Sequence, residues 1–300
     1  MKNFAAKKPS TQKLAFSLVE LSVVIFIVGV LIAGVSQTSK MLTKSKIASA
    51  QSQTKQSIVK DIPNLAVWYE SVLDESFDSL ERVDGAEVSI WNDVNPQALI
   101  SNPATQSTSA NRPIYTENII NGLPALKFGG AKVALMNNNF CTDNFTIFAV
   151  FKIGVTTTNG PFNGWQVLFA DATNLADDSV PIVVAGSSVL TANGGPADTS
   201  LYAANGKVVT DDLPHIVTVS RNMDTGARNI WVDGANNAND LNGAPGRNLR
   251  ANINMMIGRS ANNENYPGHI GEIIIFNRVL LNPERAAVEK YLSKKWGINI

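Results

Sequence analysis

The sequence predicts an all-β jelly-roll sandwich that is carried on a long N-terminal α-helix and followed by a short C-terminal helix. Three observations predict this arrangement. An apolar run at residues 16–35 continues into a polar stretch without proline or glycine, short β-branched and aromatic runs separated by turn residues begin near residue 61, and a capped amphipathic segment closes the chain. We therefore expect a helix over residues 16–60 and a sandwich domain over residues 61–300.

The composition excludes several functional classes. The 300 residues are 44% apolar and 17% charged, which is typical of a globular protein, and 25 basic residues balance 25 acidic ones. Because a chain without net charge has no bulk attraction for phosphates, we expect no nucleic-acid partner. A single cysteine, Cys141, excludes an internal disulfide framework, and two histidines, His215 and His269, leave little material for a histidine-based metal or acid–base centre.

The N-terminal region has the pattern of a membrane segment. Lysines and no acidic residue precede the run over residues 16–35, whose one charged residue is Glu20. As a helix, twenty apolar residues span about 30 Å, the thickness of the hydrocarbon core of a bilayer. A carboxylate inside such a span costs about 3 kcal/mol, so we expect Glu20 to have a functional role. Cleavage between Ala15 and Phe16 would create a matching cation, a free α-amine one helical turn from Glu20.

This segment resembles the N-terminal signal of type IV pilins and of the related secretion pseudopilins. The matching residues are Lys13-Leu14-Ala15, then Phe16-Ser17-Leu18-Val19-Glu20-Leu21, then the apolar run. The resemblance implies that residues 1–15 are a leader, and that a prepilin peptidase cuts before Phe16 and methylates its amine. It also implies that Glu20 pairs with this amine in a neighbouring subunit. Ala15 departs from the glycine that usually precedes the cut.

Residues 36–60 can continue the helix into an amphipathic half, giving a stalk roughly 68 Å long. Ile58, Ile62 and Leu65 lie at i, i+4 and i+7, so we expect them to dock the end of the helix on the domain that follows. Pro63 is expected to end the helix nearby.

The remainder of the chain predicts many short strands. Phe145–Lys152 is apolar on both alternate faces, which is typical of a central strand in a sandwich. His215–Arg221 and Arg228–Gly234 flank the turn residues Asn222–Gly226 and predict a hairpin. Further strands are expected at Gln166–Ala170, Pro181–Ala185 and Gly271–Asn277.

A short helix is predicted at the C-terminus. Asn282 is a suitable N-cap, Pro283 fits the first helical position, and Gly297 marks the end. One face carries apolar residues at i, i+4 and i+8 and is expected to pack inward: Val288, Leu292 and Trp296. Two further tryptophans are expected in the core, Trp68 and Trp231.

Several phrases between residues 61 and 300 together resemble the concanavalin A-like, laminin-G-like domains of bacterial surface proteins. They are LAVWY at 65–69, NGLPALKF at 121–128, FTIFAVF at 145–151, IGR at 257–259, GHIGEIIIFN at 268–277 and ERAAVEKYLSKKWG at 284–297. The resemblance implies a two-sheet jelly roll of a type often used to bind carbohydrate or protein ligands.

Some members of this superfamily are glucanases, and the retaining enzymes among them hold carboxylates on one strand in an E-x-D-x-x-E pattern. This sequence lacks that spacing. Glu70 and Asp74 lie four residues apart, and with Glu75 they are interpreted as a solvated helical face at the start of the domain. We therefore expect a binding protein that is not an enzyme and has no catalytic residue.

Candidate ligand residues lie in the loops that are rich in asparagine and glycine. Carboxylates at the rim of such sandwiches commonly hold calcium, and the candidate calcium ligands are Asp171, Asp177 and Asp178. The alternative for this cluster is an ordinary polar loop. Sugar binding needs aromatic faces beside amide and carboxylate groups, and the candidates are Trp165, Tyr202 and Tyr266. The alternative for each of them is packing in the core.

The two resemblances together predict a type IV pilin-like filament subunit, a minor pilin or an adhesin, that displays a lectin-like ligand-binding domain. The expected partners are a prepilin peptidase, other pilin subunits contacted through the N-terminal helix, and glycans or surface proteins. We expect a single-pass protein of the bacterial inner membrane that later enters an extracellular pilus or a periplasmic pseudopilus. Two alternatives stay open: a pseudopilin of a type II secretion system, and a membrane-anchored carbohydrate-binding module that forms no filament.

Overall fold

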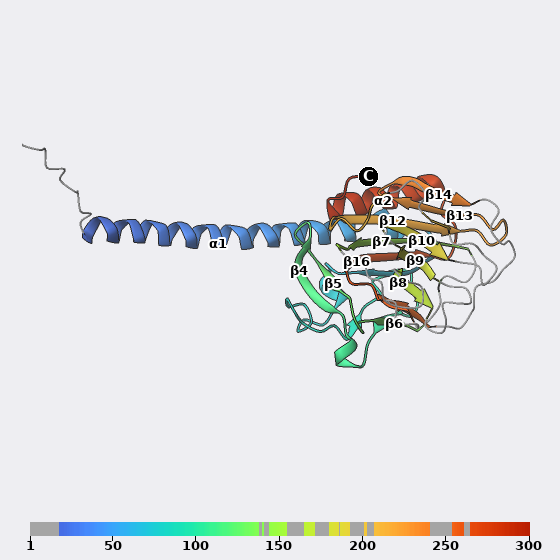
Figure 1. Ribbon diagram of the computed structural model, residues 1–300, viewed down its shortest axis with the longest axis horizontal. Coiled ribbons are helices and arrows are strands. Elements are labelled where there is room, and N and C mark those ends of the chain that lie inside the picture. The colour runs from blue at the N-terminus through green and yellow to red at the C-terminus, as the bar shows by residue number, and fades with distance from the viewer. Residues whose placement is uncertain are drawn as a thin grey trace, which may run out of the picture. The chain divides into compact units, whose positions relative to one another are not determined.

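The computed structural model describes residues 18–137, 140, 144–154, 165–171, 180–185, 187–192, 201–202, 207–240, 254–260 and 265–300. The chain divides into two compact units, Met1–Ser45 and Lys46–Ile300, and each is described by itself. Figure 1 colours the chain from blue at the N-terminus to red at the C-terminus and labels many of its elements.

Helix α1 (Leu18–Lys55) begins in the first unit. Every residue from Leu18 to Ile32 is exposed, including large apolar side chains such as Phe26, which exposes 73% of its surface. Since this segment is apolar on all sides, it presents no polar face to water. In the described part of the chain, no helix combines the length and the apolar character needed to cross a membrane.

The end of α1 differs from the expectation. The helix ends at Lys55, five residues short of residue 60, and a 3-10 helix, η1 (Ile58–Asp61), follows. Ser57 has an extended backbone (φ −69°, ψ 152°), which separates the two helices. Because of this break Ile58 faces outward and is 43% exposed, whereas Ile62 and Leu65 are buried as predicted.

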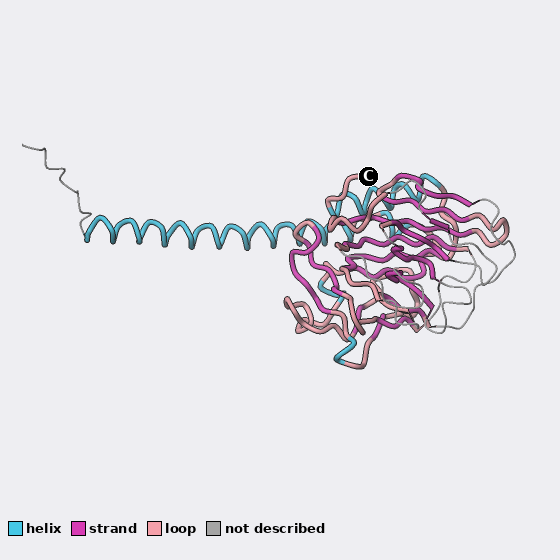
Figure 2. The backbone as a smooth tube through the Cα atoms, viewed as in Figure 1, coloured by secondary structure: helices cyan, strands magenta, loops and turns pink. Residues whose placement is uncertain are grey.

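The second unit is a sandwich of two antiparallel sheets, whose strands are drawn in magenta in Figure 2. The first sheet has the order β14 (Ala235–Asp240), β13 (Arg228–Val232), β12 (Pro214–Arg221), β7 (Phe145–Lys152), β16 (His269–Phe276), β5 (Leu123–Lys127) and β4 (Ile114–Ile120), and β1 (Leu65–Glu70) also pairs with β16. The second sheet has the order β11 (Leu201–Tyr202), β10 (Ser188–Ala192), β9 (Val180–Ala185), β8 (Trp165–Asp171), β15 (Met255–Ile257), β6 (Ala134–Met136), β3 (Ala104–Thr105) and β2 (Ile90–Trp91). Two further 3-10 helices are η2 (Asp74–Ser76) and η3 (Ser109–Asn111).

Strand β7 confirms the prediction of a central strand with two apolar faces. One face, which includes Phe145 and Phe151, belongs to the core between the sheets. The other face, which includes Phe148 and Val150, belongs to a second core on the outer side of the first sheet. The predicted hairpin is also confirmed, since β12 and β13 pair in register from Val217 to Arg221.

The second core is covered by the C-terminal helix α2 (Asn282–Trp296), which lies over β12 and β7 (Figure 1). The predicted inward face of α2 is confirmed as buried: Val288, Leu292 and Trp296. Trp68 is also buried as predicted. Trp231 was expected in the core but is only half-buried, beneath the guanidinium of Arg285. The last turns of α1 contribute Ala50 to the same core. All the residues that form this contact belong to the second unit.

The start of α2 corrects one detail. The N-cap is Leu281 rather than Asn282, because the backbone N–H of Leu281 donates to the Glu284 carboxylate at 2.9 Å. The predicted end is confirmed: Gly297 has a φ of 64°, a left-handed conformation that glycine adopts without strain.

Candidate functional site

The predicted site residues fall into three groups. Four lie outside the described residues: Ala15, Phe16, Asp177 and Asp178. Three lie on strands of the second sheet, with their side chains outside the described part: Trp165, Asp171 and Tyr202. The remaining two, Glu20 and Tyr266, are described with their side chains.

Glu20 lies in the first turn of α1 and is exposed together with its apolar neighbours. Tyr266 was predicted as a ligand contact, and the structure corrects this to a core position. Its side chain is fully buried, its hydroxyl donates to the carbonyl of Lys152 at 3.0 Å, and its ring meets that of Phe151 edge-on at 6.3 Å. Tyr266 therefore has no face to offer a sugar.

Three charged side chains, the charged cluster, lie together in the second core: Glu70, Glu272 and Lys295. Glu70 on β1 and Glu272 on β16 are register partners, which places both carboxylates on the outer side of the first sheet. The Lys295 ammonium reaches down from α2 and lies 2.7 Å from Glu70 Oε2 and 2.9 Å from Glu272 Oε2. All three side chains are fully buried.

Neutral donors complete the coordination of both carboxylates. Glu272 accepts from the indole N–H groups of Trp68 and Trp296, each at 2.7 Å, and from the hydroxyl of Tyr291 at 2.8 Å. Glu70 accepts from the backbone N–H groups of Val72 and Leu73 and from the hydroxyl of Ser76. Because every carboxylate oxygen has donors, the cluster meets the condition under which buried charges are tolerated.

The electrostatics of the cluster follow from this geometry. Burial alone would lower the pKa of Lys295, but the negative charges of Glu272 and Glu70 outweigh burial and raise this pKa above its ordinary value. Burial, followed by the charge of Glu272, raises the pKa of Tyr291 well above its ordinary value. The cluster therefore holds a lysine that stays charged and a tyrosine that stays protonated at neutral pH.

This arrangement corrects the interpretation of Glu70 as part of a solvated helical face. Glu70 is the last residue of a strand and is fully buried, whereas Asp74 and Glu75 lie on η2 and are exposed. Both buried carboxylates are held by internal donors, so the charged cluster ties β1, β16 and α2 together and leaves no carboxylate oxygen for a substrate. The spacing of Lys295 from Leu292 and Val288 indicates the inward face of α2 and could have shown its burial.

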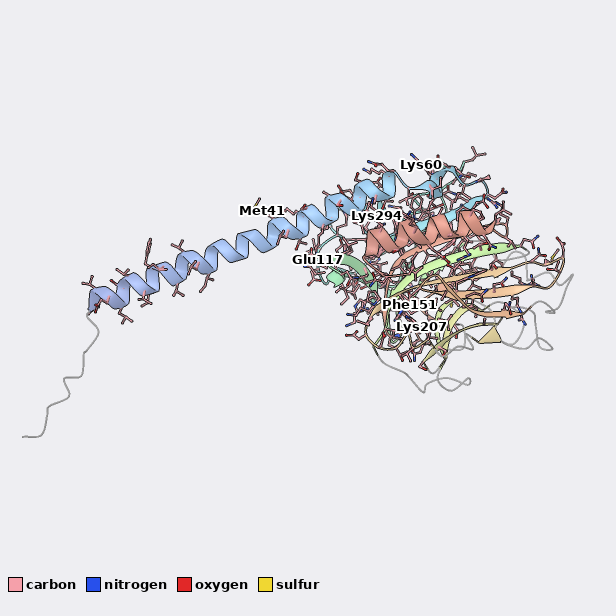
Figure 3. All side chains as sticks on the ribbon, turned by 90° about the horizontal axis from the view of Figure 1, so that it is seen from above. Met41, Lys60, Glu117, Phe151, Lys207 and Lys294 are labelled. Atoms are coloured by element: carbon pink, nitrogen blue, oxygen red, sulfur yellow. The ribbon has the colours of Figure 1, made fainter. Side chains whose placement is uncertain are left out.

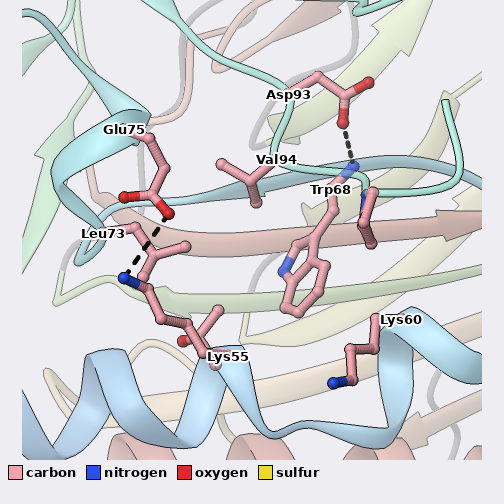
Figure 4. Close-up of a pocket in the computed structure, with 9 residues that line it drawn as sticks. Lys55, Lys60, Trp68, Leu73, Glu75, Asp93 and Val94 are labelled. Carbon is pink, nitrogen blue, oxygen red and sulfur yellow. Dashed lines mark hydrogen bonds and ion pairs between the residues drawn. The ribbon is translucent and has the colours of Figure 1, made fainter. Parts of the chain in front are cut away.

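A pocket of about 280 Å³ opens beside this cluster (Figure 4). Its lining combines apolar side chains with two lysines and two carboxylates: Thr54, Lys55, Lys60, Trp68, Leu73, Glu75, Asp93, Val94 and Pro96. The Lys55 ammonium lies 4.0 Å from the Glu75 carboxylate, and both side chains are exposed. Asp93 accepts the backbone N–H of Trp68 at 2.9 Å. Burial raises the pKa of Asp93, although three backbone N–H groups partly oppose this.

A second pocket, of about 350 Å³, lies where the end of α1 meets the end of α2. We call it the lysine pocket; it is lined by Lys46, Ser49, Ala50, Gln53, Asn121, Leu123, Lys294, Lys295, Trp296 and Gly297. Asn121 donates to the carbonyls of Trp296 and Gly297 at 2.8 and 3.0 Å, and so satisfies the end of α2. No acidic residue is among those that line this pocket.

His215, at the predicted start of a strand, is buried between two carboxylates. Its Nδ1 lies 2.8 Å from Asp233 and its Nε2 lies 3.0 Å from Asp211. Burial by itself would lower the pKa of His215, but the hydrogen bonds to Asp233 and Asp211 outweigh it and raise this pKa. Burial, together with the charges of Lys127 and Lys152, lowers the pKa of His269 to about 4.

The part of the chain that the structure describes contains no group of three or more histidine, cysteine, aspartate or glutamate side chains able to hold a metal ion.

Comparison with known proteins identifies the fold. The sequence profile of the concanavalin A-like lectin/glucanases superfamily, of laminin G type, matches residues 128–284. A search of curated proteins found no match.

Several solved structures are similar to this chain. The binding domain of Paraclostridial mosquitocidal protein 1 has a TM-score of 0.53 and 11% identity, over 80% of this chain and 56% of that one. Domain 4 of the arabinanase AbnA of Geobacillus stearothermophilus, in complex with arabinotriose, has a TM-score of 0.51 and 13% identity, over 76% of this chain and 98% of that one. A sialidase of Trypanosoma rangeli has a TM-score of 0.49 and 16% identity, and the chain spans about a third of its length. At these identities the likeness is one of fold.

Proposed function

Because this chain belongs to the concanavalin A-like lectin/glucanase superfamily, we propose that it is a type IV pilin-like filament subunit, a minor pilin or an adhesin, whose sandwich binds carbohydrate without catalysis. The leader over residues 1–15 would hold the subunit in the inner membrane until a prepilin peptidase cuts before Phe16. Glu20 would then pair with the Phe16 amine of a neighbouring subunit and set the register of the filament.

The observation that carries the filament role is the contrast between the two ends of α1. Residues 18–32 are apolar apart from Glu20 and Ser22, and all of them are exposed, so they need lipid or other helices around them. One side of the last turns packs against the second unit instead, where Ala50 and Thr54 are each 2% exposed and Gln51 donates to the carbonyl of Val72 at 3.0 Å. One helix therefore has an apolar part that requires a partner and a part that is anchored in the sandwich.

The distribution of buried residues supports a ligand site on the second sheet. The outer face of the first sheet is filled by α2 and the end of α1. Trp165, Asp171 and Tyr202 all lie on strands of the second sheet. The arabinanase domain of similar fold was solved with arabinotriose, which supports an oligosaccharide as the class of ligand.

The absence of catalysis is supported by the charged cluster. A glycosidase of this kind needs two carboxylates that reach the substrate. Glu70 and Glu272 are a close carboxylate pair in the described residues, and internal donors occupy both.

The first experiment is to shear filaments from the cells and identify this chain and its N-terminus by mass spectrometry. Recovery in filaments with an N-methylated Phe16 is expected. Processed protein that is confined to the envelope would favour a pseudopilin of a type II secretion system. Residues 1–15 still attached would contradict the filament role and favour a membrane-anchored binding module.

Carbohydrate binding is tested on the full chain with an oligosaccharide array. Trp165→Ala and Tyr202→Ala are each expected to reduce binding about two- to tenfold, because a stacked ring contributes about 0.5–1.5 kcal/mol. The control is Tyr266→Phe, which removes the hydroxyl of a buried ring outside the site. Equal binding by all three variants would contradict the assignment of these residues.

A further inference from the structure

We propose that the acidic turn of one copy of this chain docks in the lysine pocket of a second copy. The acidic turn is the loop of residues 78–87, whose sequence is DSLERVDGAE. The inference rests on the proposed function and deepens it, because it names a contact between neighbouring subunits beyond the pairing of Glu20 with Phe16. Both surfaces belong to the second unit, and neither shares a residue with the proposed carbohydrate site.

The acidic turn holds two aliphatic side chains in solvent. Leu80 exposes 82% of its surface and Val83 exposes 58%. Both ends of the turn are fixed, because Phe77 and Val88 are buried in the core between the sheets. Adjacent aliphatic side chains on the outside of a fixed turn favour a surface that a partner covers, since a turn that is already ordered loses little entropy when it binds.

Hydrogen bonds to β4 fix the middle of the acidic turn. The backbone N–H of Gly85 donates to the carbonyl of Tyr115 at 2.9 Å, and the backbone N–H of Tyr115 donates to the carbonyl of Ala86 at 2.8 Å. The Asp84 carboxylate accepts the backbone N–H of Glu117 at 3.0 Å. The turn therefore presents its side chains in one defined arrangement.

The charge of the acidic turn is negative. It contains four acidic residues and one basic residue, Arg82. Arg82 forms an ion pair with Asp74 on η2, so its charge is already used outside the turn. Three of the acidic side chains are exposed: Asp78, Asp84 and Glu87. The two aliphatic side chains are therefore surrounded by carboxylates.

The lysine pocket has the opposite character. Its volume is about 350 Å³, which leaves room for one aliphatic side chain, and the buried residues of its lining give it an apolar floor: Ala50, Leu123 and Trp296. Lys46 and Lys294 are exposed at its rim, and Figure 3 shows Lys294 on α2 beside the last turns of α1. No acidic residue lines the pocket to neutralise these two lysines.

The match between the two surfaces identifies a second copy as the occupant. An aliphatic centre rimmed by carboxylates meets an apolar floor rimmed by ammonium groups, and one chain of zero total charge carries both. A free anion would satisfy the lysines but leave the apolar floor uncovered. In the docked arrangement Leu80 enters the pocket, and the carboxylates of Asp78 and Asp84 face the lysines at its rim.

The expected strength of this contact suits a filament. Exposed ion pairs are weak and are screened by salt, so the contact is effective where the packing of α1 already holds two copies close together. A contact between two different surfaces can repeat from one copy to the next, which a filament requires.

The test uses full chains in detergent micelles, with Cys141→Ser to remove the one native cysteine. One chain carries Ser79→Cys in the acidic turn, and a second, isotopically labelled chain carries Ser49→Cys at the lysine pocket. Mass spectrometry follows the disulfide between the labelled and unlabelled chains under mild oxidation. The matched control places the first cysteine at an exposed position of the β12–β13 hairpin, Thr225→Cys. The disulfide is expected to form about tenfold faster from Ser79→Cys than from Thr225→Cys.

Charge reversal tests the ion pairs. Asp78→Lys with Asp84→Lys on the first chain should lower the rate of disulfide formation about fivefold. Lys46→Glu with Lys294→Glu on the second chain should lower it by a similar factor. When both chains carry their reversed charges, opposite charges face each other again, and the rate should return to within about twofold of the original.

Three outcomes would overturn the inference. They are a rate no higher than that of the Thr225→Cys control, no recovery when both chains carry reversed charges, and loss of the disulfide when phosphatidylglycerol is added to the micelles, which would assign the pocket to a lipid. Each of them contradicts this inference alone, because recovery of the chain from sheared filaments measures the proposed function separately. A chain that forms the disulfide but is absent from filaments would contradict the proposed function and support the contact.

Discussion

Replacement of Lys295 by methionine is expected to lower the free energy of unfolding of the sandwich by about 3–5 kcal/mol. Methionine keeps the length and the apolar stem of the lysine side chain but removes the ammonium. Glu70 and Glu272 then lose the one cation within 3 Å of both, in a site where all three side chains are fully buried. The loss comes from two like charges left without a counter-charge, because the stem packing is retained.

The assay is thermal unfolding at pH 7, followed by tryptophan fluorescence, since Trp68 and Trp296 both donate to Glu272. For a domain of this size the expected loss corresponds to a melting temperature lower by about 10 °C. The matched control is Lys294→Met, an exposed lysine one position earlier on α2, which should change the free energy by less than about 0.5 kcal/mol.

A double variant checks the mechanism. Glu272→Gln removes one of the two carboxylate charges, so it should cost less stability in the Lys295→Met background than in the wild type. A Lys295→Met loss below about 1 kcal/mol, or a loss equal to that of Lys294→Met, would refute the view that this ion cluster supports the second core.

Three further predictions concern other elements. Glu20→Ala should leave peptidase cleavage intact and reduce incorporation into filaments, measured as the ratio of this chain in sheared filaments to that in membranes; normal incorporation would contradict the role of Glu20. Gly271→Ala should destabilise the sandwich by about 1–3 kcal/mol, because an added Cβ would lie 2.5 Å from the ring of Trp296; an unchanged melting temperature would show that α2 can shift without cost. His215 and His269 should give opposite pH dependences in urea unfolding. Because the pKa of His215 is raised, its contribution to the free energy of unfolding is present below about pH 6.5 and is lost as the pH rises through the pKa of the folded state. His215→Gln should therefore lower the free energy of unfolding more at pH 5.5 than at pH 9. The pKa of His269 is lowered to about 4, so its contribution to the free energy of unfolding is present above pH 6.5 and is lost as the pH falls toward 4. His269→Gln should therefore lower the free energy of unfolding less at pH 5.5 than at pH 9. Parallel pH profiles of the two variants would contradict both assignments.

The elements that could be predicted from the sequence are those whose pattern is local. Strand β7 has two apolar faces because it lies between two cores. Its eight consecutive residues are almost all apolar, so the pattern can be recognised in the sequence. The hairpin of β12 and β13 is marked by its turn residues, and the inward face of α2 by its helical spacing.

The features that could not be predicted depend on residues far apart in the chain. Glu70 looked like a surface acid because its partner, Lys295, lies 225 positions away. Tyr266 looked like a loop residue, yet its hydroxyl is held by Lys152, 114 positions away. The end of α1 at Lys55 has no glycine or proline beside it to mark it, because Pro63 comes only after η1, and the break lies at the extended Ser57.

The pairing of β1 with β16 has a consequence for biosynthesis. The first strand of the sandwich finds its partner more than 200 residues later, as the bond from Trp68 to Glu272 shows. A chain that emerges from a ribosome cannot complete the first sheet until almost its last residues have appeared. Until then the apolar faces of the first sheet stay uncovered and prone to aggregation, and a chain truncated before α2 is expected to be degraded.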